Sequence, residues 1–404
     1  MNSYLESFIE QYHKWTLDYS CPLITSTELN YYLSKKKERL EGKGLKIEED
    51  YEHVKGEIKG DMEKKADPYS VHVLYREARH VLKYFKGGKM IASYKEPVVI
   101  YASLINKDGY EDHLVTCDNC GQEAMASIMR NGCPYCGTRF EMEDVYPCFT
   151  SFYSVPGITE REKLKEDLKR NLLIAGIGSA VILFILSFLS YEEYPILLRI
   201  LISLFSAVVG GGMMVITVYM LMSVFLLIRA FREAGRSLPL LGGINTHKKL
   251  KEKMKEYDPD FSYAYFEGRL ISLFRSIAFS DSRKDLSIYT GDNDLSFLDD
   301  AVDLSYRGAS KLESFTVEDG KIKIEMKIYM HNTYAKERLK RKDEDFIVTI
   351  EKDGKPDDLS FSITKVHCPN CGGSFDAMHK KKCPYCGSEY KLVHDDWVIS
   401  DITR

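Results

Sequence analysis

The sequence has no large excess of charge of either sign. Its 56 lysine and arginine residues are matched by 60 aspartate and glutamate residues, for a formal net charge of −4. Proteins that bind nucleic acid without regard to sequence usually carry a strong positive charge, so the composition argues against a general nucleic-acid binder. The chain opens with MNSYLESFIEQYHKW, which lacks the apolar segment of a signal peptide, and we expect no N-terminal signal.

Two long segments lack charge altogether. Residues 171–190 and 200–228 contain no Asp, Glu, Lys, Arg or His, and each reaches the length of about 20 apolar residues that a membrane-spanning helix needs. A pair of buried helices in a soluble protein is the alternative, but such helices rarely lack charge on every face. Only residues 191–195 and the few residues after them separate the two runs. We therefore expect a transmembrane helical hairpin over residues 171–229.

The flanking charges predict the orientation of this hairpin. Lysine and arginine are frequent in residues 160–170 and 229–255, whereas the turn carries Glu192 and Glu193. By the positive-inside rule the turn faces outward and both termini are cytoplasmic. Since the runs lack the ionisable residues that mark ion paths, we expect an anchor and not a transporter. Small residues four apart, such as Ala207 and Gly211, predict close packing of the two helices.

Eight of the ten cysteines form two copies of one pattern. Each copy has two Cys-x-x-Cys pairs, of which the second reads Cys-Pro-Tyr-Cys-Gly. Two such turns brought together by a hairpin supply four sulfur ligands to a tetrahedral zinc ion. We therefore predict two zinc ribbons, at residues 115–142 and 366–390. The ligands would be Cys117, Cys120, Cys133 and Cys136 in the first, and Cys368, Cys371, Cys383 and Cys386 in the second.

A four-cysteine site leaves no coordination position open for water, so the two zinc ions are predicted to be structural, and no catalytic residue is assigned. Disulfide bonds are the alternative. They require an oxidising compartment, whereas the predicted topology places both patterns in the cytoplasm. The other two cysteines, Cys21 and Cys148, are expected to be buried thiols.

The segment over residues 245–404 is predicted to form helices first and strands after. Asp258 followed by Pro259 is typical of a helix start, and an apolar face extends from there to Phe279. A second, short helix is expected within residues 294–307. The dipeptide at residues 319–320, Asp-Gly, predicts a tight hairpin turn.

Strands are expected after this turn. Ile and Met alternate with charged residues over residues 322–330, which is typical of a strand with one buried face. Further strands are expected at residues 346–351 and 397–402, on either side of the second ribbon. The alternating Ile and Met side chains either line an apolar cavity beneath the preceding helix or pack a closed core.

Helices followed by a curved antiparallel sheet with a terminal Trp strand resemble the cone-shaped α+β fold of the nuclear transport factor 2-like superfamily. More narrowly, the segment is similar to the C-terminal domain of translocase-of-the-inner-membrane subunit 44, the membrane-associated anchor of the mitochondrial import motor, which has bacterial relatives. Residues 261–279, 325–331 and 395–402 carry the resemblance. It implies a membrane-proximal domain with an apolar pocket that contacts proteins or lipid. Unlike that family, this chain carries a ribbon within the sheet and two spans before the domain.

The first 160 residues show a weaker pattern. We expect helices at residues 3–17, 26–40 and 70–84 and a strand at 98–105, and we interpret the lysine-rich stretch 35–65 as a solvated helix or linker. Lys-Asp-Gly at residues 107–109 recurs at residues 352–354. This echo indicates either a duplication of the whole domain or, as we favour, repetition of the ribbon alone.

Two basic runs, at residues 336–342 and 379–382, could contact the phosphates of RNA or of anionic lipid. Solvated loops are the alternative that we favour for both. The expected partners are thus the membrane itself, proteins and anionic lipid, with nucleic acid disfavoured.

Taken together, the predicted fold is α+β, with cytosolic domains at 1–160 and 245–404 flanking the hairpin. The expected function is that of a non-enzymatic membrane-anchored adaptor or scaffold in the bacterial plasma membrane. A membrane-tethered RNA or ribosome contact and a pocket enzyme on the cone-shaped fold are the alternatives.

Overall fold

The computed structural model describes residues 2–19, 25–54, 57–130, 132–138, 142, 144–157, 161–237, 241–363, 365–378 and 380–404. Its internal contacts divide the chain into two units. One combines Met1–Gly157 with Leu240–Arg404, and the other is Ile158–Pro239. We call the first the two-lobed unit, with a first lobe before and a second lobe after the helical hairpin. The two soluble segments, expected as separate domains, therefore belong to one unit.

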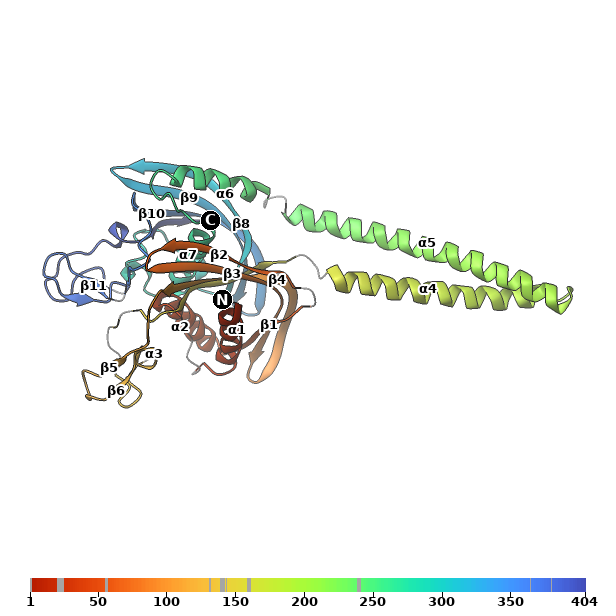
Figure 1. The fold of residues 1–404 in the computed structure, drawn as a ribbon, viewed down its shortest axis with the longest axis horizontal. Coiled ribbons are helices and arrows are strands. Elements are labelled where there is room, and N and C mark those ends of the chain that lie inside the picture. Colours follow the sequence, from red (N-terminus) through yellow and green to blue (C-terminus); the bar gives the residue numbers. More distant parts are fainter. Residues whose placement is uncertain are drawn as a thin grey trace. The chain divides into compact units, whose positions relative to one another are not determined.

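The first lobe consists of two helices followed by an antiparallel sheet (Figure 1). Its strands pair in the order β1-β3-β4-β7, and β2 also pairs with β3. The first ribbon, with β5, β6 and the short helix α3, is inserted between β4 and β7. The elements are α1 (Asn2–Leu17), α2 (Thr27–Gly42), β1 (Leu45–Glu52), β2 (Lys59–Ala66), β3 (Tyr69–Lys86), β4 (Lys89–Lys107), β5 (Leu114–Thr116), β6 (Glu123–Met125), α3 (Ala126–Met129) and β7 (Cys148–Pro156).

The second lobe has the same plan. Two helices precede an antiparallel sheet with the order β13-β10-β9-β8, and the second ribbon, with β11 and β12, is inserted between β10 and β13. The elements are α6 (Leu241–Met254), α7 (Tyr263–Phe279), β8 (Ala301–Glu318), β9 (Lys321–Ala335), β10 (Leu339–Asp353), β11 (Val366–His367), β12 (Ser374–Phe375) and β13 (Val398–Thr403), with short 3-10 turns at Arg283–Asp285, Ser296–Leu298 and Leu392–His394.

The edge strands show how far the correspondence between the lobes extends. β1 and β2 pair with successive parts of β3 and run in the same direction, so together they form one long edge interrupted at residues 53–58. β8 pairs in the same way along β9, with a break in register around Gly308. Both sheets therefore follow one four-strand path with the ribbon before the last strand. This supports duplication of the whole lobe, against our preference for repetition of the ribbon alone.

Several elements of the first lobe differ from the prediction. The helices at 3–17 and 26–40 are confirmed as α1 and α2, and Ser26 caps α2 by accepting a hydrogen bond from the Leu29 N–H. The helix expected at 70–84 is instead part of β3, and the stretch 35–65 contains β1 and most of β2. The prediction failed because buried charged residues such as Arg76 and His80 interrupt the alternation that marks a strand.

In the second lobe, one predicted helix begins later than expected and the other is reduced to a single short turn. α7 begins after Ser262, whose hydroxyl accepts from the Tyr265 N–H, and not at Asp258. The Asp258 carboxylate instead accepts a hydrogen bond of 2.8 Å from Lys64 of the first lobe. The short helix expected within residues 294–307 is present as the 3-10 turn Ser296–Leu298, after which the chain enters β8 at Ala301.

The hairpin turn and the alternating strand of the second lobe are confirmed. Asp319 and Gly320 have φ angles of 51° and 77° between the paired residues Glu318 and Lys321. Five alternating side chains of β9 have no accessible surface: Ile322, Ile324, Met326, Ile328 and Met330. A side chain beside a cavity that admits water would retain some accessible surface. The strand therefore packs a closed core, the second of the two alternatives left open by the sequence, and the described residues give no support to an apolar cavity beneath α7.

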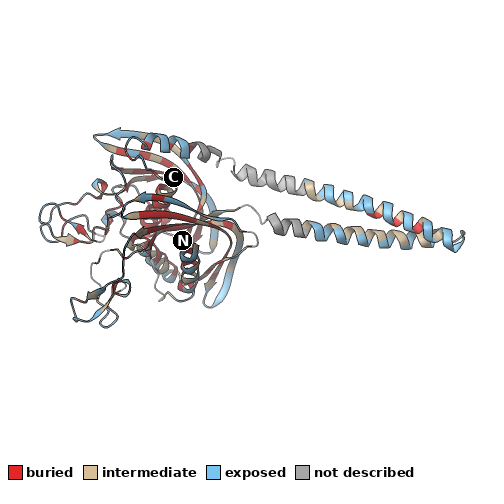
Figure 2. Cartoon of the chain, in the orientation of Figure 1, coloured by how far each residue is buried: buried red, intermediate tan, exposed pale blue. Residues whose placement is uncertain are grey.

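The two lobes share this core (Figure 2). One continuous cluster of buried side chains includes Phe8 and Phe152 of the first lobe together with Phe274 and Trp397 of the second. At Gly308, whose φ is +73°, an added β-carbon would lie 2.9 Å from Val155 of β7. The sheet edges thus meet where only glycine fits without displacement.

A buried network of charges also joins the lobes. The Lys36 ammonium on α2 lies 3.4 Å from a Glu49 oxygen on β1 and 3.0 Å from an Asp303 oxygen on β8. Glu49 also accepts from Tyr12 at 2.8 Å and contacts His80 Nε2 at 2.9 Å. All of these side chains are almost fully buried. Because a buried charge without its partner is strongly destabilising, the network ties α2 and β1 to the second lobe.

Replacing the central cation should therefore unfold the two-lobed unit more easily. We expect Lys36→Met to lower its unfolding free energy by about 3–5 kcal/mol, because Asp303 and Glu49 lose the buried ammonium that both contact. Denaturant unfolding of the detergent-solubilised chain measures this value. Lys37→Met is the matched control, since Lys37 is only partly buried. Equal stability of the two variants would show that the network does not hold the lobes together.

The same network predicts a pH dependence. Although burial opposes its charged form, hydrogen bonds to Glu49 and Glu96 raise the pKa of His80 to about 9. A raised pKa contributes stability that is complete below the pKa of an unfolded histidine, about 6.5, and is lost as pH rises to about 9. We expect a loss of up to about 3 kcal/mol over this range. In His80→Gln this slope should disappear, and a slope that persists would assign the effect to other groups.

Candidate metal centres and membrane anchor

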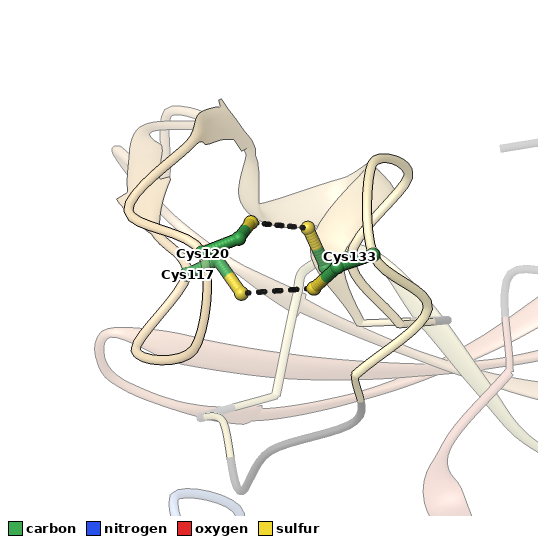
Figure 3. A group of neighbouring side chains, drawn as sticks. Cys117, Cys120 and Cys133 are labelled. Atoms are coloured by element: carbon green, nitrogen blue, oxygen red, sulfur yellow. Dashed lines mark hydrogen bonds between the residues drawn. The ribbon is translucent and has the colours of Figure 1, made fainter.

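Each predicted zinc ribbon brings its four cysteines together. In the first ribbon, the β5–β6 hairpin carries Cys117 and Cys120, and the segment after α3 carries Cys133 and Cys136. The side chains of Cys117, Cys120 and Cys133 point toward one centre (Figure 3). The second ribbon groups Cys368, Cys371, Cys383 and Cys386 in the same way. In each group the four sulfur atoms lie within 4.8 Å of one another.

The distances between sulfur atoms fit a tetrahedral metal site. The shortest separations across the two ribbons are 3.6 to 3.7 Å, as between Cys120 and Cys133 or Cys371 and Cys383. Four sulfur atoms at about 2.3 Å from a zinc ion would lie about 3.8 Å apart. A disulfide would need about 2.05 Å. The geometry therefore fits a metal held by four thiolates and excludes the disulfide alternative for these eight residues.

The backbone of the four Cys-x-x-Cys turns follows one repeated pattern. The first cysteine of each turn donates its N–H to the carbonyl of the residue five positions on, and its own carbonyl accepts from the N–H of the glycine after the second cysteine. These glycines all have φ between 71° and 75°, a conformation that favours glycine. They are Gly121, Gly137, Gly372 and Gly387. The four turns are thus equivalent in backbone conformation and hydrogen bonding.

Polar side chains next to the sulfur atoms correspond as well. The Asn119 amide lies 3.7 Å from the Cys136 sulfur, and the Asn370 amide lies 3.6 Å from that of Cys386. Hydrogen bonding to the hydroxyl of Thr138 lowers the pKa of Cys136 to about 6, and the hydroxyl of Ser388 lowers that of Cys386 to about 5. Both effects favour the thiolate, the form that binds metal. In the same groups, although a backbone hydrogen bond opposes the shift, removal from water and hydrogen bonds to the neighbouring sulfur atoms raise the pKa of Cys120 and Cys371 to about 12. Without a metal, the thiolate is therefore favoured at one cysteine of each group and disfavoured at another.

The ribbons differ in how they join the rest of the two-lobed unit. Cys117 and Cys133 pack with Met129 in a small cluster of their own. Cys368 and Cys383 instead belong to the main core, together with Phe375 of β12. Folding of the second ribbon is therefore coupled directly to the core of the second lobe.

A cleft of about 500 Å³ lies between the ribbons. Both ribbons lie at the same end of the two-lobed unit (Figure 1), and residues at the base of each line the cleft, among them His113 and Thr116 from the first and Lys365 and His367 from the second. The aromatic ring of Tyr146 forms part of the wall between them. The two ribbons thus form a single composite surface.

A third group of possible ligands was not predicted from the sequence. Glu6, His53 and Glu57 place one ligand atom each within 4.8 Å of one another. However, the Arg76 guanidinium forms an ion pair with Glu6 and lies 3.0 Å from His53 Nε2. Because this cation already occupies the position beside the carboxylate, the group is better described as an ion-pair cluster than as a metal site.

Cys148, one of the two cysteines outside the ribbons, is a buried thiol as predicted. It lies on β7 in a cluster with Val71, Val73 and Ile105. Burial raises its pKa well above the usual range of a thiol. Cys21 lies outside the described residues.

A further polar feature at the junction of the lobes is absent from the predictions. The half-buried Glu267 carboxylate on α7 accepts hydrogen bonds from the hydroxyls of Tyr306 at 2.6 Å and Tyr263 at 3.4 Å. Tyr153 of β7 donates a third, at 3.5 Å. Removal from water raises the pKa of this carboxyl. No sequence pattern could have indicated the group, because its members come from three distant elements.

The helical hairpin consists of α4 (Arg161–Ser190) and α5 (Ile196–Ser237). Both helices contain stretches long and apolar enough to cross a membrane: Leu168–Ser190 with mean hydropathy 2.7 and Ile196–Val224 with 2.1. Their large apolar side chains are mostly exposed (Figure 2), unlike those of a core helix. A lipid environment accounts for this exposure.

Small residues hold the two helices together. The buried residues in Ile196–Val224 are Ser203, Ala207 and Gly211, spaced four apart. A β-carbon added to Gly211 would lie 3.1 Å from that of Ala180 on α4. The small-residue packing predicted for the hairpin is therefore confirmed. At the turn, the Arg199 guanidinium stacks 4.0 Å from the Phe188 ring and donates to the Phe188 carbonyl.

Comparisons with profiles of known protein families, with curated proteins and with solved structures returned no match. The resemblance to the import-motor subunit therefore stays a prediction.

Metal content tests the two centres directly. We expect elemental analysis of the purified, unstripped chain to find two metal ions, and Cys120→Ser or Cys371→Ser to lose one each, since four ligands are needed for a closed site. The second variant should also lower the unfolding free energy of the two-lobed unit by about 3 kcal/mol or more, because its ribbon packs into the main core. The two cysteines are matched, as both are exposed. Equal destabilisation by the two variants would contradict this difference.

Proposed function

We propose that the protein is a membrane-anchored adaptor that presents two zinc ribbons as a docking surface for other proteins. The observation that carries this proposal is the placement of both four-cysteine centres at one end of a shared core, on either side of one cleft. Two sites that fold around metals and lie side by side can present a composite surface without a catalytic group. The duplicated lobes supply the rigid support that such a surface needs.

The metal proposed for both centres is zinc, in a structural role. Four thiolates in tetrahedral arrangement are the ligand set of structural zinc sites. Four sulfur ligands leave no position for a water nucleophile, which supports a non-enzymatic role.

The location proposed is the bacterial plasma membrane, with the two-lobed unit in the cytoplasm. The exposed apolar hairpin supports insertion, and the basic residues that flank it in the sequence support the orientation. Thiolate metal centres persist in a reducing compartment, which agrees with this side of the membrane. In each lobe, helices come first and an antiparallel sheet with a four-strand path follows. This is the order of elements that the resemblance to the cone-shaped fold implies.

The ribbon surface offers large exposed side chains for a partner. Tyr135 and Tyr385 occupy equivalent positions between the cysteines of the two Cys-Pro-Tyr-Cys turns and are 63 % and 69 % exposed. Tyrosine is enriched in protein interfaces because it combines an apolar ring with a polar tip. We infer that these two rings flank the contact with a protein partner.

Photo-crosslinking in living cells tests the proposal. A benzophenone amino acid at Tyr135 or Tyr385 should give discrete protein adducts that resist ribonuclease and are lost when Cys120→Ser or Cys371→Ser unfolds the corresponding ribbon. The same amino acid at Lys95, an exposed residue on β4, is the control and should give none. Adducts that disappear with ribonuclease would favour the RNA contact instead, and the absence of adducts at both tyrosines would overturn the docking role.

A further inference from the structure

Two hairpin turns meet at the end of the two-lobed unit opposite the ribbons. β4 runs from Lys89 to Lys107 before the first ribbon, a length of roughly 60 Å for 19 residues. β10 likewise runs from Leu339 toward the second ribbon. The β3–β4 and β9–β10 turns therefore both lie at the far ends of their sheets. β7 also runs toward this end, since Cys148 pairs with Ile105 and Pro156 with Val98.

The two turns are held side by side by contacts between the lobes. A small core cluster joins Leu45 and Tyr84 of the first lobe to Ala335 of the second, with Leu339 packed against it. The Arg341 guanidinium lies 4.2 Å from the Tyr94 ring and 3.0 Å from a Glu96 oxygen. The residues of both turns thus share one surface.

This surface carries an excess of positive charge. Among the described residues, six exposed cations at or beside the two turns form no ion pair. Of the exposed acids beside them, Asp343 and Asp345 are already paired, with His331 and Arg307 and with Lys327, which leaves Glu41 and Glu337. We call this surface the basic end. Its cations are Lys46, Lys86, Lys89, Arg338, Lys340 and Lys342.

Apolar side chains are exposed among these cations. Met90 and Ile91, directly after Lys89, are 53 % and 46 % exposed. Beside them, a mostly apolar cleft of about 510 Å³ is lined by Leu45, Ile47 and Phe85. Exposed methionine and isoleucine next to several lysines are typical of surfaces that enter the interface of an anionic membrane.

We propose that the basic end binds the surface of an anionic lipid bilayer. Its lysines would contact lipid phosphates, and Met90 with Ile91 would enter the boundary between headgroups and acyl chains. A bilayer is the occupant indicated, because the same chain carries two helices that can cross one. Binding to single-stranded nucleic acid would call for aromatic rings on which bases stack, whereas the exposed apolar side chains here are aliphatic. This proposal does not depend on the docking role of the ribbons.

Tryptophan quenching in lipid nanodiscs tests the contact. The full chain is inserted into nanodiscs that contain brominated phosphatidylglycerol or brominated phosphatidylcholine, and Met90→Trp reports proximity to the bromine atoms. The native Trp15 and Trp397 are buried and give a constant background. The matched control is Tyr385→Trp, an exposed aromatic position at the ribbon end. We expect Met90→Trp to be quenched in phosphatidylglycerol and Tyr385→Trp to stay at background.

Charge reversal separates lipid recognition from mere proximity. Adding Lys86→Glu, Lys89→Glu and Lys340→Glu to Met90→Trp should return its quenching to the level of the control, with metal content unchanged as the check on folding. High salt should have the same effect because it screens exposed charges. Quenching that is absent, that is equal in phosphatidylcholine, or that survives charge reversal would overturn the proposal. Binding of a labelled single-stranded RNA through the same lysines without phosphatidylglycerol-specific quenching would also overturn it.

Discussion

The contact between Lys36 and the carboxylates of Glu49 and Asp303 fixes how the two lobes sit against each other. α2 extends this contact, because the Arg39 guanidinium donates to the carbonyls of Phe279 at 2.8 Å and of Leu298 at 3.0 Å in the second lobe. Buried charges that are paired across a boundary, as Lys36 is with Asp303, allow few alternative arrangements. This packing of the lobes places both ribbons at one end of the two-lobed unit. It also brings the β3–β4 and β9–β10 turns together at the other end.

Local patterns were predictable from the sequence, and buried charges were not. The cysteine turns and the Asp319–Gly320 hairpin depend on neighbouring residues, whose preferences are visible in the chain itself. Lys35, Lys36 and Lys37 form a uniform basic run, yet only Lys36 is buried, because its partners come from β1 and β8. The same cause hid β3, whose polar residues are paired with side chains distant in sequence. The eight cysteines that the structure gathers into two groups were thus found from the sequence, whereas the joining of the lobes was not.

The duplicated plan explains why two distant cysteine patterns form one surface. Each ribbon occupies the connection that leads into the last strand of its sheet, β7 in the first lobe and β13 in the second. In each sheet this connection lies at the end opposite the long hairpin turn, which is β3–β4 in the first lobe and β9–β10 in the second. Because the two lobes pack through a common core, both ribbons lie at the same end of the two-lobed unit. The interruption at residues 53–58 and the different helix lengths obscure this symmetry in the sequence.

The two ribbons nevertheless differ in their packing. Among the described residues, Cys117 and Cys133 of the first ribbon lie in a small cluster of their own, which leaves a bound metal as the main source of stability that this ribbon could gain. In the second ribbon, Phe375, Ala377 and Met378 extend the main core, so core packing stabilises this ribbon directly. Distortion of the first ribbon would therefore cost the lobes little. Distortion of the second ribbon would disturb the core that holds both lobes, so the first ribbon is the more adaptable of the two and the second the more rigid.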